Sequence, residues 1–259
     1  MLLALDIGNT EITAGLFQGD TLEVHWRLTT NPDRTPDEWA GALAGFLIQA
    51  GHSPDEVAAV CLASVAPTVT QSLVEGIAIA TGRAAVAVHA RSPLPVTLDV
   101  DEPLTVGADR IVNVLAAVAL YQADTIVVDF GTATTFDCIT GDARFLGGVI
   151  MPGIRTASDQ LTRRAAKLPA TELKAPSRVI GRRTEECIQA GILYGTADAV
   201  DGIVRRIRAE WPGSDSPRVV ATGGLASVVA PLTTSIEQTH PDLTLQGLRI
   251  AASHLGLRW

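Results

Sequence analysis

Short runs of apolar residues, separated by glycine, proline and polar turns, dominate the pattern along this chain. Residues 2–7, 12–17 and 22–28 predict three consecutive strands, and Gly19-Asp20 forms the turn between the last two. Thr35 and Pro36 begin a helical pattern that Gly51 ends. A buried strand (57–65), a helix from Pro67 to about residue 80 and a further strand (84–89) follow, so the first half has an α/β pattern.

The second half repeats this order of elements. Residues 107–122 predict a loop that leads into an apolar helix, and the elements after it are strands at 125–130, 134–140 and 143–154, helices at 154–166 and 184–210, a strand at 217–221 and two final helices, the last from about 246. Residues 3–17 align with 126–140, which places Asp6 on Asp129 and Gly8 on Gly131 at an offset of 123 residues, close to half the chain. We interpret this as two duplicated α/β domains, residues 1–117 and 118–259, with a central cleft; the alternative is a chance likeness of two buried strands.

Charge and cysteine usage exclude several classes of protein. The chain has 20 basic and 28 acidic residues and a net charge of −8, and we see no lysine or arginine cluster, which argues against a nucleic-acid partner. Three widely spaced cysteines form no C-x-x-C pair, and no apolar run is long enough to span a membrane. The beginning, MLLALDIGNT, does not resemble a signal peptide. We therefore expect a cytoplasmic protein with no membrane partner.

Two loops of the form Asp-x-Gly follow buried strands and suit phosphate chemistry. In DIGNT (6–10) and DFGTATT (129–135) the glycine allows a tight turn, and the amides and hydroxyls after it can face a phosphate. The strand-end carboxylate can hold Mg²⁺ that bridges phosphate oxygens. Thr222-Gly223-Gly224 after a third strand strengthens the interpretation; the alternative is that Asp6 and Asp129 only cap turns.

Other known phosphate-binding loops are absent. Neither Lys167 nor Lys174, the only lysines, follows the glycine pattern of a P-loop, and no G-x-G-x-x-G occurs. Phosphoryl transfer by this chain would therefore depend on backbone amides, threonines, a metal ion and arginine.

Gly107-Ala108-Asp109-Arg110 precedes the apolar helix IVNVLAAVAL. The carboxylate could accept a proton from a substrate hydroxyl while the guanidinium binds a substrate anion. The alternative is an ordinary first-turn aspartate beside a solvated arginine. The helix itself could supply a subunit interface or pack in the core.

These motifs together resemble type III pantothenate kinases, which belong to the acetate and sugar kinase/actin superfamily. The resemblance runs to about residue 224 and rests on DIGNT, GADR, DFGTATTFD (129–137), LGGVIMPG (146–153), AAKLP (165–169) and IGRRT (180–184). It implies two ribonuclease H-like (actin-like ATPase) domains. It also implies ATP-dependent phosphorylation of the primary hydroxyl of pantothenate, the first step of coenzyme A biosynthesis, by a homodimer.

The resemblance assigns roles to individual residues. Asp109 would be the general base, and Gly107, Ala108, Asp109 and Arg110 the pantothenate-binding loop. Asp129 would bind a monovalent cation, K⁺ or NH₄⁺, and Thr184 would contact pantothenate across the dimer interface. ATP would be held by Thr132 and by the first turn, which comprises Asp6, Ile7, Gly8, Asn9, Thr10, Glu11, Ile12 and Thr13. Asp6 would also hold Mg²⁺ through phosphate.

This chain departs from the family pattern at a few positions. Val100 stands where the family usually has a tyrosine that contacts pantothenate, so this chain lacks one hydroxyl contact that affects substrate affinity. Glu11 and Arg183 replace asparagines at positions with no expected chemical role. Two alternatives stay open: another small-molecule kinase or phosphatase of the superfamily, and a nucleotide-binding regulatory protein.

Overall fold

A computed structural model describes residues 1–213 and 215–259 and divides them into two compact units. The first unit comprises Met1–Ala119 and Leu243–Trp259, and the second comprises Leu120–Asp242. The break after residue 119 lies close to the expected boundary at 117. The C-terminal segment differs from the expectation, because it folds with the first unit and not with the second half of the chain.

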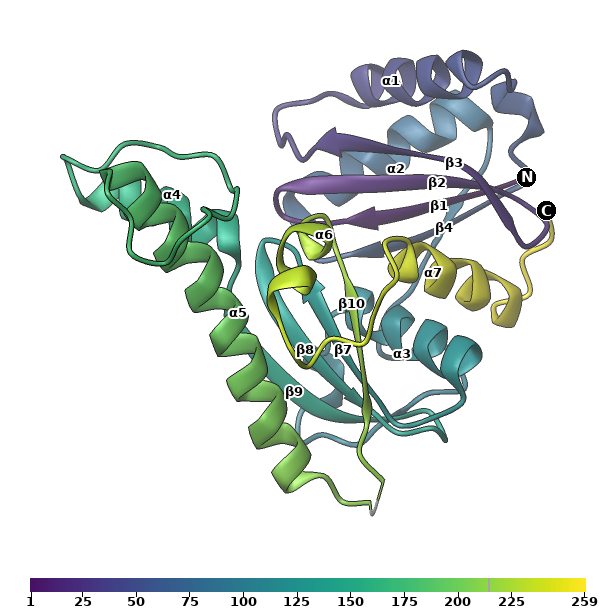
Figure 1. Ribbon diagram of the computed structural model, residues 1–259. Helices are drawn as coiled ribbons and strands as arrows, with labels where there is room; N and C mark the ends of the chain where they lie inside the picture. The colour runs from purple at the N-terminus through teal and green to yellow at the C-terminus, as the bar shows by residue number, and fades with distance from the viewer. Residues whose placement is uncertain (214) are drawn as a thin grey trace. The chain divides into compact units, whose positions relative to one another are not determined.

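The first unit contains a five-stranded sheet and, among its helices, α1 and α2, which connect strands of that sheet (Figure 1). They are β1 (Leu2–Ile7), β2 (Glu11–Gln18), β3 (Thr21–Thr29), α1 (Pro36–Gln49), β4 (Ala59–Ser64), α2 (Pro67–Thr81) and β5 (Ala85–Ala87). The sheet order is β3-β2-β1-β4-β5, with β1 antiparallel to β2 and parallel to β4. The meander of three strands predicted at the start of the chain is confirmed.

The central strand β1 packs side chains on both faces of this sheet. Leu3, Leu5 and Ile7 pack with residues of α1 and α2, whereas Leu2 and Ala4 pack with α3 (Ala108–Tyr121) and α7 (Leu243–His254). A strand between two helical layers must be apolar on both faces, which explains the continuous run LLALDI. The same contacts decide the role of the apolar helix after GADR: α3 packs in the core of its own unit.

The ends of α1 follow the local sequence signals. The Thr35 side chain accepts a hydrogen bond from the Glu38 amide, and the Glu38 carboxylate accepts one from the Thr35 amide at 2.8 Å, which makes a capping box. Pro36 occupies the first turn, and Gly51 follows the helix with φ +86°, a conformation that favours glycine.

The second unit repeats the strand order of the first. Its elements are β7 (Thr125–Phe130), β8 (Ala133–Ile139), β9 (Arg144–Pro152), α4 (Ile154–Arg164), α5 (Thr184–Glu210), β10 (Arg218–Thr222), α6 (Ala226–Val229) and β11 (Gln238–Thr239). The order β9-β8-β7-β10-β11 matches β3-β2-β1-β4-β5, with the same parallel and antiparallel pairs. The predicted duplication and the ribonuclease H-like α/β class are therefore confirmed.

The register of the two hairpins refines the predicted alignment. Asp6 pairs with Thr13 across β1 and β2, and Asp129 pairs with Thr135 across β7 and β8. The offset is 123 residues on the first strand of each hairpin but 122 on the second, because the second turn is one residue shorter. An ungapped alignment of 3–17 with 126–140 is therefore one residue out of register after the turn.

Several short elements were not predicted from the sequence. They are β6 (Thr97–Leu98), β11 and the 3₁₀ helices at Pro54–Glu56, Pro103–Thr105 and Ala230–Leu232, of which Pro54–Glu56 has a capping box formed by Ser53 and Glu56. The last helix begins at Leu243, slightly before the predicted residue 246. In the part of the chain that the structure describes, no helix combines the length and the apolar character that crossing a membrane requires.

Candidate active site

The turn after β1 is fixed by hydrogen bonds at both of its sides. The Gly8 amide donates to the Glu11 carbonyl at 3.0 Å, and a methyl group on Gly8 would lie 2.8 Å from that oxygen. Thr30, at the end of β3, donates its hydroxyl to the Gly8 carbonyl at 2.6 Å and its amide to the Thr10 carbonyl at 3.0 Å. A third strand thus holds the DIGNT turn in one conformation.

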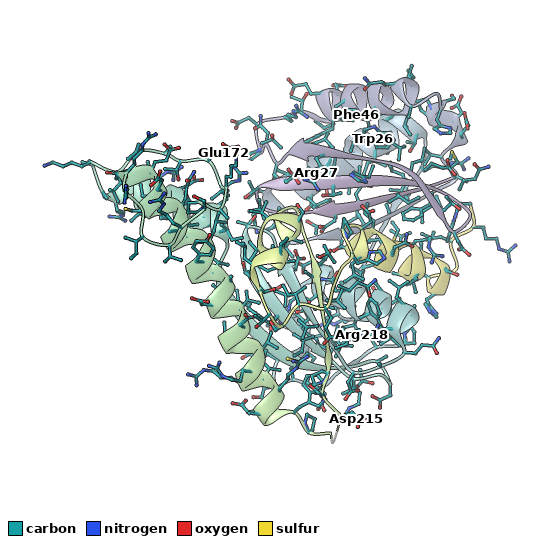
Figure 2. The ribbon with its side chains drawn as sticks, in the orientation of Figure 1. Trp26, Arg27, Phe46, Glu172, Asp215 and Arg218 are labelled. Carbon is teal, nitrogen blue, oxygen red and sulfur yellow. The ribbon has the colours of Figure 1, made fainter. Side chains whose placement is uncertain are left out.

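The predicted ATP-binding residues of this turn differ in what they can offer a ligand. Ile7 and Ile12 are fully buried, so only their backbone groups can reach a nucleotide. Asn9 and Thr10 are exposed at the tip, and Asp6 and Thr13 are partly buried and paired across the hairpin. Glu11 is exposed, and its carboxylate lies 3.5 Å from Nε of Arg27 on β3, so its side chain has a partner there. Arg27 is labelled in Figure 2.

The turn after β7 is held in a similar way, although by a helix. The Gly131 amide donates to the Ala133 carbonyl at 3.0 Å. The Thr132 carbonyl accepts two hydrogen bonds, from the Gly153 amide at 3.1 Å and the Thr156 hydroxyl at 2.7 Å. A methyl group on Gly153 would overlap Thr132, so the beginning of α4 lies directly against the turn.

Asp129 lies against the glycine pair that follows β10. Thr222 pairs with Asp129 across the parallel strands β10 and β7, and Gly223 has φ +90°. A methyl group on Gly223 would overlap the Asp129 carboxylate and lie 2.7 Å from the Phe130 nitrogen. The missing side chain of Gly223 therefore allows the segment after β10 to approach the end of β7 closely.

GADR forms the first turn of α3. The Asp109 carboxylate accepts a hydrogen bond from the Arg110 amide at 2.8 Å, and the Gly107 carbonyl accepts one from the Ile111 amide at 3.2 Å. A methyl group on Gly107 would overlap the Asp109 carboxylate, so the glycine makes room for it. Burial raises the pKa of Asp109 above its usual range, against the opposing effect of Arg110.

Asp6 and GADR meet at the same edge of the first unit's sheet. β1 and β4 are parallel, and Val65, just past β4, donates its amide to the Ile7 carbonyl at 3.0 Å. A methyl group on Gly107 would lie 3.4 Å from the Val65 side chain, so GADR lies beside this strand end. The carboxyl ends of strands are where α/β sheets bind ligands.

Two predicted residues, Val100 and Thr184, belong neither to the Asp6 turn and GADR nor to the Asp129–Thr132 turn. Val100 is partly buried in the stretch between β6 and the 3₁₀ helix Pro103–Thr105. Thr184 is exposed at the first position of α5, in the second unit, and follows the exposed side chains of Val179 (68%) and Ile180 (85%).

Thr30 and Thr156 anchor the two turns but were not predicted from the sequence. Each comes after a strand, β3 or β9, that runs back to the turn it supports, so their positions become visible only when the strands pair. A threonine next to a strand end is too common to single out.

The residues around Asp6 fit a metal ion that binds mainly to the phosphate groups of a nucleotide and to water. Within residues 1–213 and 215–259, no three histidine, cysteine, aspartate or glutamate side chains gather to hold a metal ion. A Mg²⁺ ion at Asp6 would therefore take most of its oxygen ligands from phosphate and water, which Mg²⁺ commonly does.

Comparison with known proteins extends over nearly the whole chain. The family described as type III pantothenate kinase matches residues 2–206. A type III pantothenate kinase from Moorella thermoacetica is 46% identical over 96% of this chain and 98% of its own length. One from Thermomicrobium roseum is 45% identical over 97% and 96%.

Solved structures with low identity share the fold. A ROK hexokinase from Thermus thermophilus matches with a TM-score of 0.52 and 16% identity over 97% of both chains. A Campylobacter jejuni protein, described as a Baf family transcriptional activator, matches with a TM-score of 0.61 and 17% identity over 97% of both chains. At such identities these two likenesses show the fold alone, so neither favours a regulatory role.

Proposed function

The chain belongs to the type III pantothenate kinase family, and on that premise we propose that Asp109 is the base of the reaction that it catalyses. The reaction transfers the γ-phosphoryl group of ATP to the primary hydroxyl of pantothenate, the first step of coenzyme A biosynthesis. The new bond joins the pantothenate oxygen to the γ-phosphorus. The bond to the β-phosphate oxygen breaks, ADP leaves, and the hydroxyl proton moves to Asp109.

The position of Asp109 is the observation that carries this proposal. Its carboxylate is held by the Arg110 amide and by the space that Gly107 leaves, beside the strand end that also bears Asp6. A carboxylate whose pKa is raised by burial is a stronger base than a solvated aspartate. Phosphoryl transfer depends mainly on positioning and charge neutralisation, so no lysine is required.

The turn from Asp6 to Thr13 would hold the ATP phosphates. Its supporting feature is rigidity, since Gly8 and Thr10 are both hydrogen-bonded to Thr30. The Gly8–Thr10 tip would supply amides and hydroxyls, and Asp6 would hold Mg²⁺ through phosphate and water. When bound, Mg²⁺ neutralises phosphate charge.

Asp129 and Thr132 would supply further contacts to the nucleotide and its cation. Thr132 would contact ATP, and its carbonyl accepts hydrogen bonds from Gly153 and Thr156, which fix the position of this turn. Asp129 would hold K⁺ or NH₄⁺, with a carboxylate position fixed by its closeness to Gly223. A carboxylate surrounded by backbone suits a hard cation with oxygen ligands.

We propose that Gly107, Ala108, Asp109 and Arg110 bind pantothenate, and that Thr184 of a second copy completes the site. A homodimer would cover the exposed Val179 and Ile180 side chains that precede Thr184. Val100 cannot donate the hydrogen bond of the usual tyrosine, so we expect weaker pantothenate binding. A cytoplasmic location is part of this proposal, and it agrees with the three cysteines, none of which forms a disulfide within the described residues.

A coupled ADP-release assay, with and without pantothenate and with Na⁺ in place of K⁺, tests this function. We expect ADP only when pantothenate is present, and much less in Na⁺. Turnover of another small molecule without pantothenate would instead support a different kinase, and nucleotide binding without any turnover a regulator.

Asp109→Asn, compared with Asp37→Asn, tests the base. Asp37 is an exposed first-turn acid of α1, so it controls for the loss of a helix-terminal charge. We expect kcat to fall about 10²–10⁴-fold in Asp109→Asn and to stay normal in Asp37→Asn. Near-normal turnover in Asp109→Asn would remove Asp109 from this role.

A further inference from the structure

Residues 155–183 of the second unit concentrate positive charge in an acidic chain. They contain eight of the chain's 20 lysines and arginines but only two of its 28 acidic residues, a net charge of +6 where the whole chain has −8. The basic residues occur singly or as the pairs Arg163-Arg164 and Arg182-Arg183, so no long basic run stands out in the sequence. All eight are exposed: Arg155, Arg163, Arg164, Lys167, Lys174, Arg178, Arg182 and Arg183.

Most of these charges have no close acidic partner. Among residues 1–213 and 215–259, none of the eight side chains lies within ion-pair distance of an acidic group, and only Arg178 and Arg183 act at longer range on a carboxylate, that of Glu186, whose pKa they help to lower. Figure 2 shows nitrogen-tipped side chains projecting from the chain around α4, near the labelled Glu172. Unpaired like charges on one surface add up to a field that attracts anions.

The basic segment is held in place at several points. The Glu172 carbonyl accepts a hydrogen bond from Gln189 at 3.0 Å, and the Pro176 carbonyl accepts one from the Tyr194 hydroxyl at 2.5 Å, both from α5. At its beginning, the Thr156 hydroxyl binds the Thr132 carbonyl. The segment therefore begins against the turn that is proposed to contact ATP.

We propose that residues 155–183 form a cationic surface that captures ATP and draws it toward the Thr132 turn. This inference rests on the proposed function, which makes ATP a substrate. A chain with a net charge of −8 repels a polyanion, and a local positive surface beside the site reverses that repulsion and raises the association rate. Pantothenate carries a single carboxylate, so the effect on it should be much smaller.

The composition of the segment favours a nucleotide over a nucleic acid. Proteins that bind single strands combine positive charge with aromatic side chains on which bases stack. Residues 155–183 contain no phenylalanine, tyrosine or tryptophan. The segment therefore offers charge without a stacking surface.

The test compares two pairs of adjacent arginines on helices of the second unit. Arg163→Gln/Arg164→Gln removes charge from the end of α4, and Arg205→Gln/Arg206→Gln removes the same charge near the end of α5. All four side chains are exposed, and the control pair lies about 30 Å along α5 from Thr184. The probe is a fluorescent ATP analogue, and the readout is its association rate by stopped flow.

We expect the α4 pair to slow association about 3-fold to 10-fold at about 10 mM salt, and the difference to vanish near 1 M, where the Debye length falls to about 3 Å. The control pair should leave the association rate and turnover unchanged. Lys167→Gln/Lys174→Gln, outside the helices, should reproduce the effect if circular dichroism shows that the α4 variant has lost helix.

Equal salt dependence in the α4 and control variants would overturn the inference. So would an unchanged ATP association rate together with a selective loss of oligonucleotide binding, because the surface would then serve a nucleic acid. Failure of the proposed function is distinguishable: the wild-type protein would make no ADP with pantothenate while its nucleotide association still depended on the α4 pair.

Discussion

The approach of Gly223 to Asp129 allows a sharp test of the second nucleotide turn. In Gly223→Ala the new methyl group would overlap the Asp129 carboxylate and lie 2.7 Å from the Phe130 nitrogen and 2.8 Å from its carbonyl carbon. Ordinary contact begins at 3.4 Å, so two backbone segments must separate by several tenths of an ångström. The alanine must also adopt φ +90°.

These two effects can be assigned rough magnitudes. An alanine held at positive φ costs about 1 kcal/mol, and overpacking against a rigid neighbour costs about 1–3 kcal/mol. The free energy of unfolding should therefore fall by about 2–4 kcal/mol. For a chain of this size, that corresponds to a decrease in Tm of roughly 5–15 °C.

Gly51→Ala provides the matched control. Gly51 has φ +86° but no atom within 4 Å of its hypothetical methyl group, so it carries only the backbone cost of about 1 kcal/mol. Denaturant unfolding measures both variants, and the ADP-release assay in K⁺ and Na⁺ reports on Asp129. Gly223→Ala should lose most of its K⁺-dependent turnover, and Gly51→Ala should keep it. Equal stability of the two variants, with normal turnover in both, would refute the close-approach argument.

Asp109, the two anchoring threonines and the cysteines allow further tests. Burial raises the pKa of Asp109, so the free energy of unfolding should fall as the pH rises from the unfolded-state pKa through this raised value. At pH 7, Asp109→Asn should therefore unfold at an equal or higher denaturant concentration than wild type, and a marked decrease would contradict this. Thr30→Val and Thr156→Val should each lower the free energy of unfolding by about 1 kcal/mol and raise the KM for ATP. Unchanged kinetics in both variants would exclude the anchoring role. Burial raises the pKa of Cys61 to about 12, so a thiol reagent at pH 8 should label the exposed Cys187 quickly and Cys61 only after unfolding; fast labelling of Cys61 in the native protein would be inconsistent with its burial.

Strand and helix positions were predictable because their signals are local. β1 is apolar on both faces and α1 carries its own capping box, so neither needs distant residues to be identified. The DIGNT, GADR and DFGTATT motifs are also contiguous, and they carry the family resemblance in the sequence alone. The short strands β6 and β11 have too few residues for any periodicity and form only by pairing.

The order of the main elements, the duplication and the motifs on which the site proposals rest could all be predicted without a structure. Which distant residues support those motifs became clear only from the fold. It brought Thr30 to the first turn and Gly223 against Asp129, it returned the C-terminal helix to the first unit, and it gathered exposed charge on residues 155–183. Local patterns reflect the conformational preferences of neighbouring residues, whereas these contacts depend on strand pairing and burial between segments far apart in the chain.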